Sequence, residues 1–236
     1  ILLPALGNAR DSARTMRCAS NLKQLGLATA MYVNDHDYSY MTNNFETGSW
    51  DYKLGAYDGR GTPPTLSSNF FAQIAAGADW ATIYACPSDE IESTNPNLFY
   101  RRSYTFNEYR QDDDSRPGFV GYDVFGSGAA ISKYDARNET EVLNASKALT
   151  ITDYHRDNNR INNPEIVSVF RMWFVTPANP GALDNDQSRF PHSDGIMNSL
   201  YADGHVELVD RFDAARSPSG IFLGGNATGT QFDAAN

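Results

Sequence analysis

A short stretch near the C-terminal end of this 236-residue chain contains side chains that could do chemistry. Ten residues separate His192 from Asp203, which is followed directly by Gly204 and His205. An imidazole beside a carboxylate can act as a general base or as a metal ligand. Asp153 and His155, from an earlier segment, would complete such a cluster. These residues define one hypothesis, a metal or acid-base site that includes His192 and Asp203.

A structural interpretation of the same residues is also open. Asp-Gly is a preferred composition for a two-residue type I′ turn, so Asp203 and Gly204 are explained by a hairpin between LYA and HVEL. His192 would then tie the preceding loop to the hairpin through hydrogen bonds. The sequence contains no nucleophile elbow, P-loop, HExxH motif or dinucleotide fingerprint. The absence of these motifs favours a structural role for His192 and Asp203. A metal-dependent enzyme that uses them ranks behind two non-enzymatic hypotheses, a structural protein and a binding domain.

The two cysteines, Cys18 and Cys86, allow two interpretations. Neither has a CxxC partner or a nearby histidine in the sequence, which argues against zinc. They either form one disulfide, as in exported proteins, or remain as two buried thiols. A bridge closing a loop of this length would stabilise the fold by roughly 4 kcal/mol through chain entropy.

Residues 1–34 are predicted to form one long amphipathic helix that positions Cys18. Apolar residues recur at spacings of three and four, while Arg14, Arg17 and Lys23 lie on the opposite face. The first six residues, ILLPAL, are apolar all round and too few to cross a bilayer, which needs about 20. We expect them to be the end of a longer hydrophobic helix. The stripe comprises Cys18, Leu22, Leu25, Thr29 and Tyr32.

The rest of the chain is predicted to be a loop-rich α+β head over 35–216, followed by a Gly/Asn-rich tail over 217–236. β-Branched and aromatic residues predict strands within 147–154 and 165–175, and IMNSLYADGHVELVDRF predicts the closing hairpin. A short helix is expected over 68–77, and 38–66 reads as loop. A long helix followed by strands indicates an α+β fold with the helix packed on an antiparallel sheet.

Composition excludes two classes of partner. The formal net charge is −10, and no basic stripe offsets it. Such a chain is not expected to bind nucleic acid, because the affinity of proteins for nucleic acid rests on basic side chains that contact the phosphates. The same charge argues against docking on anionic lipid.

Several segments together resemble one family. ILLPALGNAR and CASNLKQLGLATAMYVNDHD at the start, then CPSD, SYTFN and ALTITD, resemble bacterial pseudopilin-like proteins, which are relatives of type IV pilins and type II secretion pseudopilins. His192 with Asp203, Gly204 and His205 resembles their C-terminal motif, although the spacing is one residue longer than usual. A β-bulge or an extra residue near Asp194 would absorb the difference.

The resemblance implies a fold, a location and partners. The fold would be type IV pilin-like, and the protein a non-enzymatic, membrane-anchored subunit of the cell envelope with a periplasmic or extracellular head. Other pilin or pseudopilin subunits would bind through the N-terminal helix, and a prepilin peptidase would process the precursor. The resemblance also favours a Cys18–Cys86 disulfide. The expected protein has no required cofactor. If a cation is bound, the resemblance favours Ca²⁺ at Asp184 and Asp186, with His192, Asp203 and Asp153 as further candidates.

A binding domain is the second hypothesis. A surface or secreted domain could recognise carbohydrate or another protein through exposed aromatic side chains. The candidates are Tyr38, Trp50, Tyr57 and Trp80. Large aromatic residues more often belong to the core, which weakens this interpretation.

Overall fold

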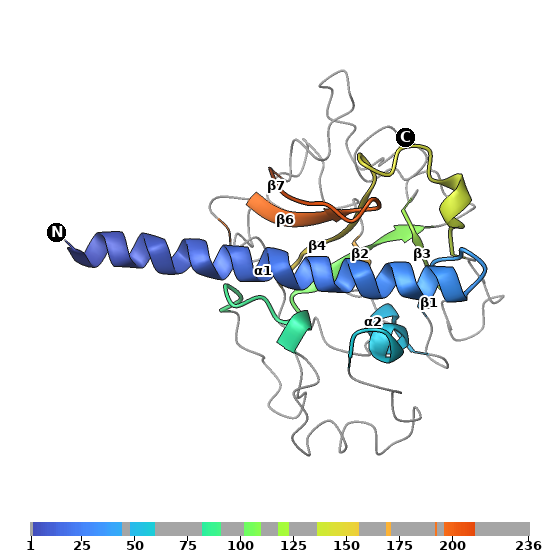
Figure 1. Cartoon of the computed structure of the whole chain (residues 1–236), viewed down its shortest axis with the longest axis horizontal. Helices are drawn as coiled ribbons and strands as arrows, with labels where there is room; N and C mark the ends of the chain where they lie inside the picture. Colours follow the sequence, from blue (N-terminus) through green and yellow to red (C-terminus); the bar gives the residue numbers. More distant parts are fainter. Residues whose placement is uncertain are drawn as a thin grey trace, which may run out of the picture.

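The computed structural model describes residues 2–43, 48–59, 82–90, 102–109, 118–122, 136–155, 169–170, 192 and 196–210. One long helix, α1 (Leu2–Asp35), packs across a seven-stranded sheet (Figure 1). The strands are β1 (Thr42–Asn43), β2 (Tyr104–Tyr109), β3 (Val120–Tyr122), β4 (Leu149–Asp153), β5 (Val169–Phe170), β6 (Ile196–Tyr201) and β7 (Val206–Asp210). The short helices are α2 (Trp50–Lys53), η1 (Leu54–Ala56), η2 (Thr82–Tyr84) and η3 (Glu139–Glu141). This arrangement confirms the predicted α+β class and is consistent with a type IV pilin-like fold.

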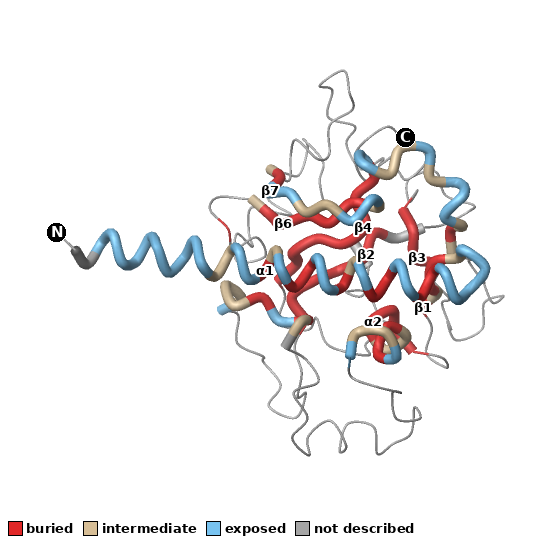
Figure 2. Tube along the Cα trace, viewed as in Figure 1, coloured by how far each residue is buried: buried red, intermediate tan, exposed pale blue. Residues whose placement is uncertain are grey.

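The buried face of α1 is the predicted stripe. All five of its residues, Cys18 to Tyr32, are at most 9% exposed. Residues 4–13 are exposed, and this part of the helix extends beyond the body of the molecule (Figure 2). Within the described residues, no helix has a stretch long and apolar enough to cross a membrane. The helix therefore has a packed C-terminal part and an unsupported N-terminal part.

The centre of the sheet is antiparallel, as predicted. β4 lies between β2 and β6, with Thr152 paired to both Thr105 and Ser199, and β7 follows β6. Three short pairings are parallel: β1 with β3, β3 with β2, and β5 with β2. The predicted strand in 147–154 is confirmed as β4, and β5 lies within the predicted 165–175, most of which is outside the described residues.

The turn of the closing hairpin differs from the prediction. Gly204 N–H donates to Tyr201 O at 2.9 Å, and Tyr201 N–H donates to His205 O at 2.9 Å. Gly204 has a φ of +85°, whereas a type I′ turn would require positive φ at Asp203 as well, and Asp203 lacks it. The connection is thus a three-residue loop that ends in a glycine, so the predicted two-residue turn is wrong.

The segment predicted as loop over 38–66 contains regular structure. It includes β1, α2 and η1, and Trp50 at the start of α2 is fully buried. Its backbone N–H donates to Asn43 Oδ1 at 2.6 Å, and its ring packs against Phe106 and Tyr84. Tertiary burial of one aromatic ring thus orders a segment whose composition is typical of turns. The predicted helix over 68–77 and the tail over 217–236 lie outside the described residues.

Candidate functional site

His192 connects three parts of the fold. Its Nδ1 lies 3.0 Å from Thr15 Oγ1, and its Nε2 lies 3.1 Å from Asp153 Oδ2. The same Nε2 is 3.6 Å from Cys86 Sγ. The residue is only 6% exposed, so these contacts form a closed cluster rather than an open cleft.

The members of the cluster come from four separate parts of the chain. Thr15 and Cys18 are three residues apart on α1, which places them on neighbouring positions of one helix face. Cys86 follows η2, and Asp153 is the last residue of β4. His192 forms an isolated antiparallel bridge with Ile196, the first residue of β6. The helix, a loop and the end of β4 therefore converge on the imidazole, while the backbone of His192 pairs with β6.

The predicted disulfide is present. Cys18 and Cys86 are bonded across 68 positions of sequence, and both are buried. The alternative of two buried thiols is wrong, because neither cysteine is free. The bond fixes the loop after η2 to the middle of α1. Close by, Tyr104 Oη donates to Cys18 O at 3.2 Å and Asn21 Nδ2 donates to Ala85 O at 3.0 Å.

Asp153 is a fully buried carboxylate with unequal oxygens. Its Oδ2 accepts hydrogen bonds from Asn198 N at 2.7 Å and from Asn198 Nδ2 at 2.9 Å, in addition to its contact with His192. Its Oδ1 is buried and has no hydrogen-bond partner among the described residues. Burial, and then the charge of Asp153, raises the pKa of Tyr104 well above its ordinary value. A buried oxygen left without a donor is rare and calls for an explanation.

A second histidine–aspartate pair lies beside the first. His155 Nδ1 is 3.2 Å from Asp89 Oδ1, and both side chains are buried. Ser103 Oγ donates to Asp89 Oδ2 at 2.6 Å. One ligand atom each of Cys86, Asp153 and His155 lies within 4.8 Å of the others. The prediction that Asp153 and His155 would gather near His192 is therefore supported by the geometry.

Asp203 does not belong to this cluster. It is in the hairpin turn, where its Oδ1 accepts from His205 N at 3.1 Å and contacts His205 Nδ1 at 2.5 Å. Partial burial raises the pKa of Asp203, but the hydrogen bonds from His205 outweigh it and leave the pKa below its ordinary value. β6 separates the turn from His192 by roughly 20 Å, at about 3.3 Å per residue. The proposed convergence of His192 with Asp203 is wrong, because the strand holds them at opposite ends.

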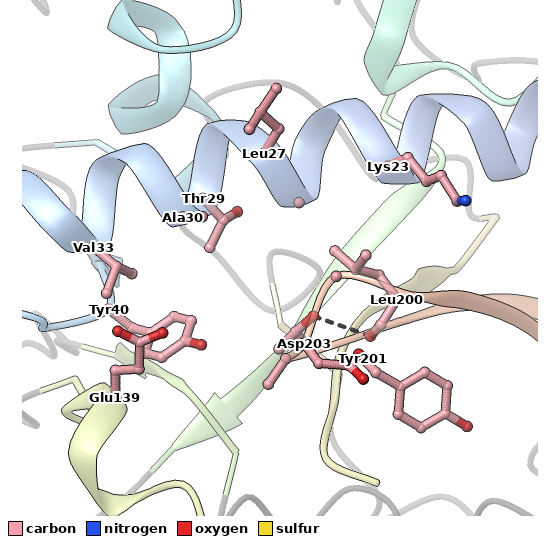
Figure 3. A pocket seen from close by; sticks show the side chains of 14 residues that line it. Lys23, Leu27, Thr29, Ala30, Val33, Tyr40, Glu139, Leu200, Tyr201 and Asp203 are labelled. Carbon is pink, nitrogen blue, oxygen red and sulfur yellow. Dashed lines mark hydrogen bonds between the residues drawn. The ribbon is translucent and has the colours of Figure 1, made fainter. Parts of the chain in front are cut away.

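The turn instead forms one wall of a groove of about 390 Å³ (Figure 3). Leu27 and Val33 of α1 line it together with Leu200 of β6, and Asp203 lies at the turn. Lys23 on α1 and Glu139 of η3 add charged groups. The sequence did not predict this groove, which exists only because the hairpin turn approaches the helix.

The other predicted sites have mixed outcomes. Trp50 is fully buried, so the prediction that its ring is exposed to bind carbohydrate is wrong. Tyr38 is 53% exposed, and Tyr57 is partly buried. Trp80 lies outside the described residues. So do Asp184 and Asp186, and the calcium site therefore stays a prediction.

Sequence analysis missed two residues of the His192 cluster, Thr15 and Asn198, and one buried ion pair of the core, Arg102 with Asp51. Thr15 lies one turn before Cys18, a spacing that could have placed it on the same helix face. Asn198 lies on a predicted strand, but nothing marked its contact with Asp153. Arg102 is fully buried and paired with Asp51, with its guanidinium 4.9 Å from the Trp50 ring. Burial lowers the pKa of Arg102, and the Asp51 charge opposes that shift. Long-range pairing of this kind leaves no local pattern.

Comparison with known proteins yields one family. A family model described as "Protein of unknown function (DUF1559)" matches residues 7–134, more than half of the chain. No curated protein and no solved structure matches. The matched segment contains α1 from Gly7 onward and both cysteines. It ends before Asp153, His155 and His192.

Proposed function

The chain belongs to the family described as proteins of unknown function (DUF1559), and from that premise we propose that it is a non-enzymatic, pseudopilin-like subunit of an envelope assembly. The assembly would be related to type II secretion or type IV pilus systems. The full-length protein would be anchored in the inner membrane with its head in the periplasm. Its partners would be other subunits of the same kind, together with the prepilin peptidase that processes the precursor.

The observation that carries this proposal is the overhang of α1, residues 4–13 (Figure 1). Helices in proteins gain most of their stability from packing one face against a partner, and the exposed residues 4–13 lack such packing in the isolated chain. Leu6, within the overhang, is 68% exposed, and Met16, shortly after it on α1, is 73% exposed. Neighbouring helices in a fibre or a membrane would cover such a surface.

The His192 cluster supports a non-enzymatic role. A general base must reach its substrate, and His192 is enclosed by Thr15, Asp153 and the disulfide. Asp203, the other residue of the resembled motif, is taken up by its hydrogen bonds within the turn. His192 thus links the start of β6 to the helix, and Asp203 closes the hairpin turn.

The test uses the full-length precursor in cells with and without a prepilin peptidase. We expect a peptidase-dependent loss of mass at the N-terminus, and sedimentation with membranes in both strains. Mass spectrometry and fractionation give the readouts. A precursor that stays soluble and uncleaved beside an active peptidase would refute the proposal.

A matched pair of variants tests the role of the overhang. Leu6→Glu places a charge on the projecting helix, and Leu143→Glu places one on the head, where Leu143 is 78% exposed. Chemical cross-linking in membranes should show subunit ladders for Leu143→Glu and a loss of at least about half of them for Leu6→Glu. Equal ladders for the two variants would show that subunits do not meet through this helix.

A further inference from the structure

We propose that the dithiol form of this chain has a zinc site made by Cys18, Cys86, His192 and Asp153. These side chains come from α1, the loop after η2, the segment before β6, and the end of β4. Every chain is synthesised with two thiols, so the dithiol form precedes the disulfide. The site would hold the same elements together before the bond forms, or after it is reduced.

The geometry of the folded chain already approaches a zinc site. One ligand atom each of Cys18, Cys86 and His192 lies within 4.8 Å of the others. With Zn–S near 2.3 Å and Zn–N or Zn–O near 2.0–2.1 Å, tetrahedral ligands lie about 3.3–3.8 Å apart. The observed separations are 3.6 Å from Cys86 Sγ to His192 Nε2 and 3.1 Å from that nitrogen to Asp153 Oδ2. Small side-chain movements would admit an ion between these three groups.

The surroundings also fit a metal. All four side chains are buried, so an ion would be held away from competing water. The Oδ2 of Asp153, the oxygen 3.1 Å from His192, already accepts two hydrogen bonds from Asn198, whereas its buried Oδ1 has no hydrogen-bond partner in the described part of the chain, so Oδ1 is the oxygen open to an ion. His192 donates or accepts at Thr15 through its other nitrogen, which is the kind of contact that orients a metal-bound imidazole. The free oxygen and the oriented ring both gain a function when zinc is present.

The choice of zinc follows from the ligands. Thiolate and imidazole prefer zinc over calcium or magnesium, which favour oxygen ligands. Both groups of close ligand side chains found in the described residues contain Cys86. In the oxidised chain the sulfur of Cys86 is bonded to Cys18, so the disulfide form cannot make this site.

Reduction converts one form into the other. A dithiol reductant transfers two electrons and two protons to the Cys18–Cys86 bond, and itself becomes a disulfide. The two thiols then release their protons as Zn²⁺ binds their sulfurs. In the reverse direction a small-molecule disulfide accepts two electrons from the two zinc-bound sulfurs and is reduced to thiolates, the Cys18–Cys86 bond re-forms, and the ion is released, so disulfide and zinc exclude one another.

The experiment measures zinc binding to the purified chain before and after reduction by a dithiol, in competition with a chromophoric chelator. We expect one zinc ion per reduced chain and none above background for the oxidised chain. Co²⁺ in place of Zn²⁺ should give thiolate charge-transfer absorption only after reduction. Zinc should also raise the Tm of the reduced chain.

Histidine variants make the assignment specific. His192→Asn should weaken zinc binding at least about 10-fold, because it removes a ligand. His205→Asn is the matched control, since His205 is in the exposed hairpin turn, and its affinity should equal that of the parent. Zinc binding that is equal in these two variants would come from thiols of an unfolded chain and would overturn the proposal. A reduced parent chain that binds no zinc would overturn it as well, whether circular dichroism shows it folded or unfolded.

Discussion

The buried side chain of His192 holds several elements of the fold together. It contacts the helix through Thr15, the sheet through Asp153, and the disulfide through Cys86. Removing one partner of a buried polar contact leaves the other unsatisfied, which costs about 1–3 kcal/mol. The residue that first suggested chemistry is thus explained as a junction between elements, with a metal role in the reduced chain as our proposal.

Buried tyrosines predict loss of stability at alkaline pH. Burial, and then Tyr57, raises the pKa of Tyr32 to about 12, and burial with nearby Glu207 and Asp203 raises that of Tyr201 to about 12. In the unfolded chain tyrosine ionises near pH 10. The folded state therefore binds these protons more tightly. Its stability is complete below about pH 10 and falls as the pH rises toward 12.

Denaturant unfolding at pH 8 and pH 11 measures this effect. Tyr32→Phe should reduce the difference in free energy of unfolding between the two pH values, because phenylalanine has no proton to lose. Tyr38→Phe, at a side chain 53% exposed, should leave the difference as in the parent. Equal behaviour of the two variants would show that Tyr32 does not contribute.

At the scale of elements, Gly26 of α1 packs tightly against Leu200 of β6. A Cβ built there would lie 3.0 Å from Leu200 Cδ1 and 3.1 Å from its Cδ2. Gly26→Val should therefore destabilise the protein by about 1–3 kcal/mol through overpacking. Gly7→Val is the control, because nothing lies within 4 Å of a Cβ at Gly7. Thermal unfolding should show a lower Tm for Gly26→Val alone, and an unchanged Tm would mean that Leu200 moves aside without cost.

The hairpin turn illustrates how an element can be predicted while its geometry is not. Asp203-Gly204 correctly indicated a reversal between β6 and β7. The extra residue Ala202 enters the loop because its N–H donates to Ala148 O at 2.9 Å and Asp203 N–H donates to Ala145 O at 3.2 Å. Contacts with the segment before β4 therefore select a three-residue loop over the shorter turn.

For the whole molecule, the overhang of α1 should be dispensable for the stability of the isolated chain. Deleting residues 1–11 removes the projecting part of α1, which is described from Leu2 onward, and leaves Ser12, a preferred N-cap residue, at the new end. The free energy of unfolding should change by less than about 0.5 kcal/mol, as for other exposed positions. Thr15→Val, which removes the bond to His192, should cost about 1 kcal/mol. A large loss on deletion, measured by denaturant titration, would show that the overhang packs on the head in solution.

The sequence by itself determined several local elements of this protein. Periodicity in residues 1–34 predicted α1 and its buried stripe, and β-branched runs predicted β4 and the closing hairpin, because these patterns follow directly from helix and strand geometry. Resemblance to a family, rather than spacing, favoured the Cys18–Cys86 pairing. Only the tertiary structure decided that His192 meets Asp153 and not Asp203. The length and register of β6 decide which side chains come into contact. Both are fixed by pairing with strands that are distant in the sequence.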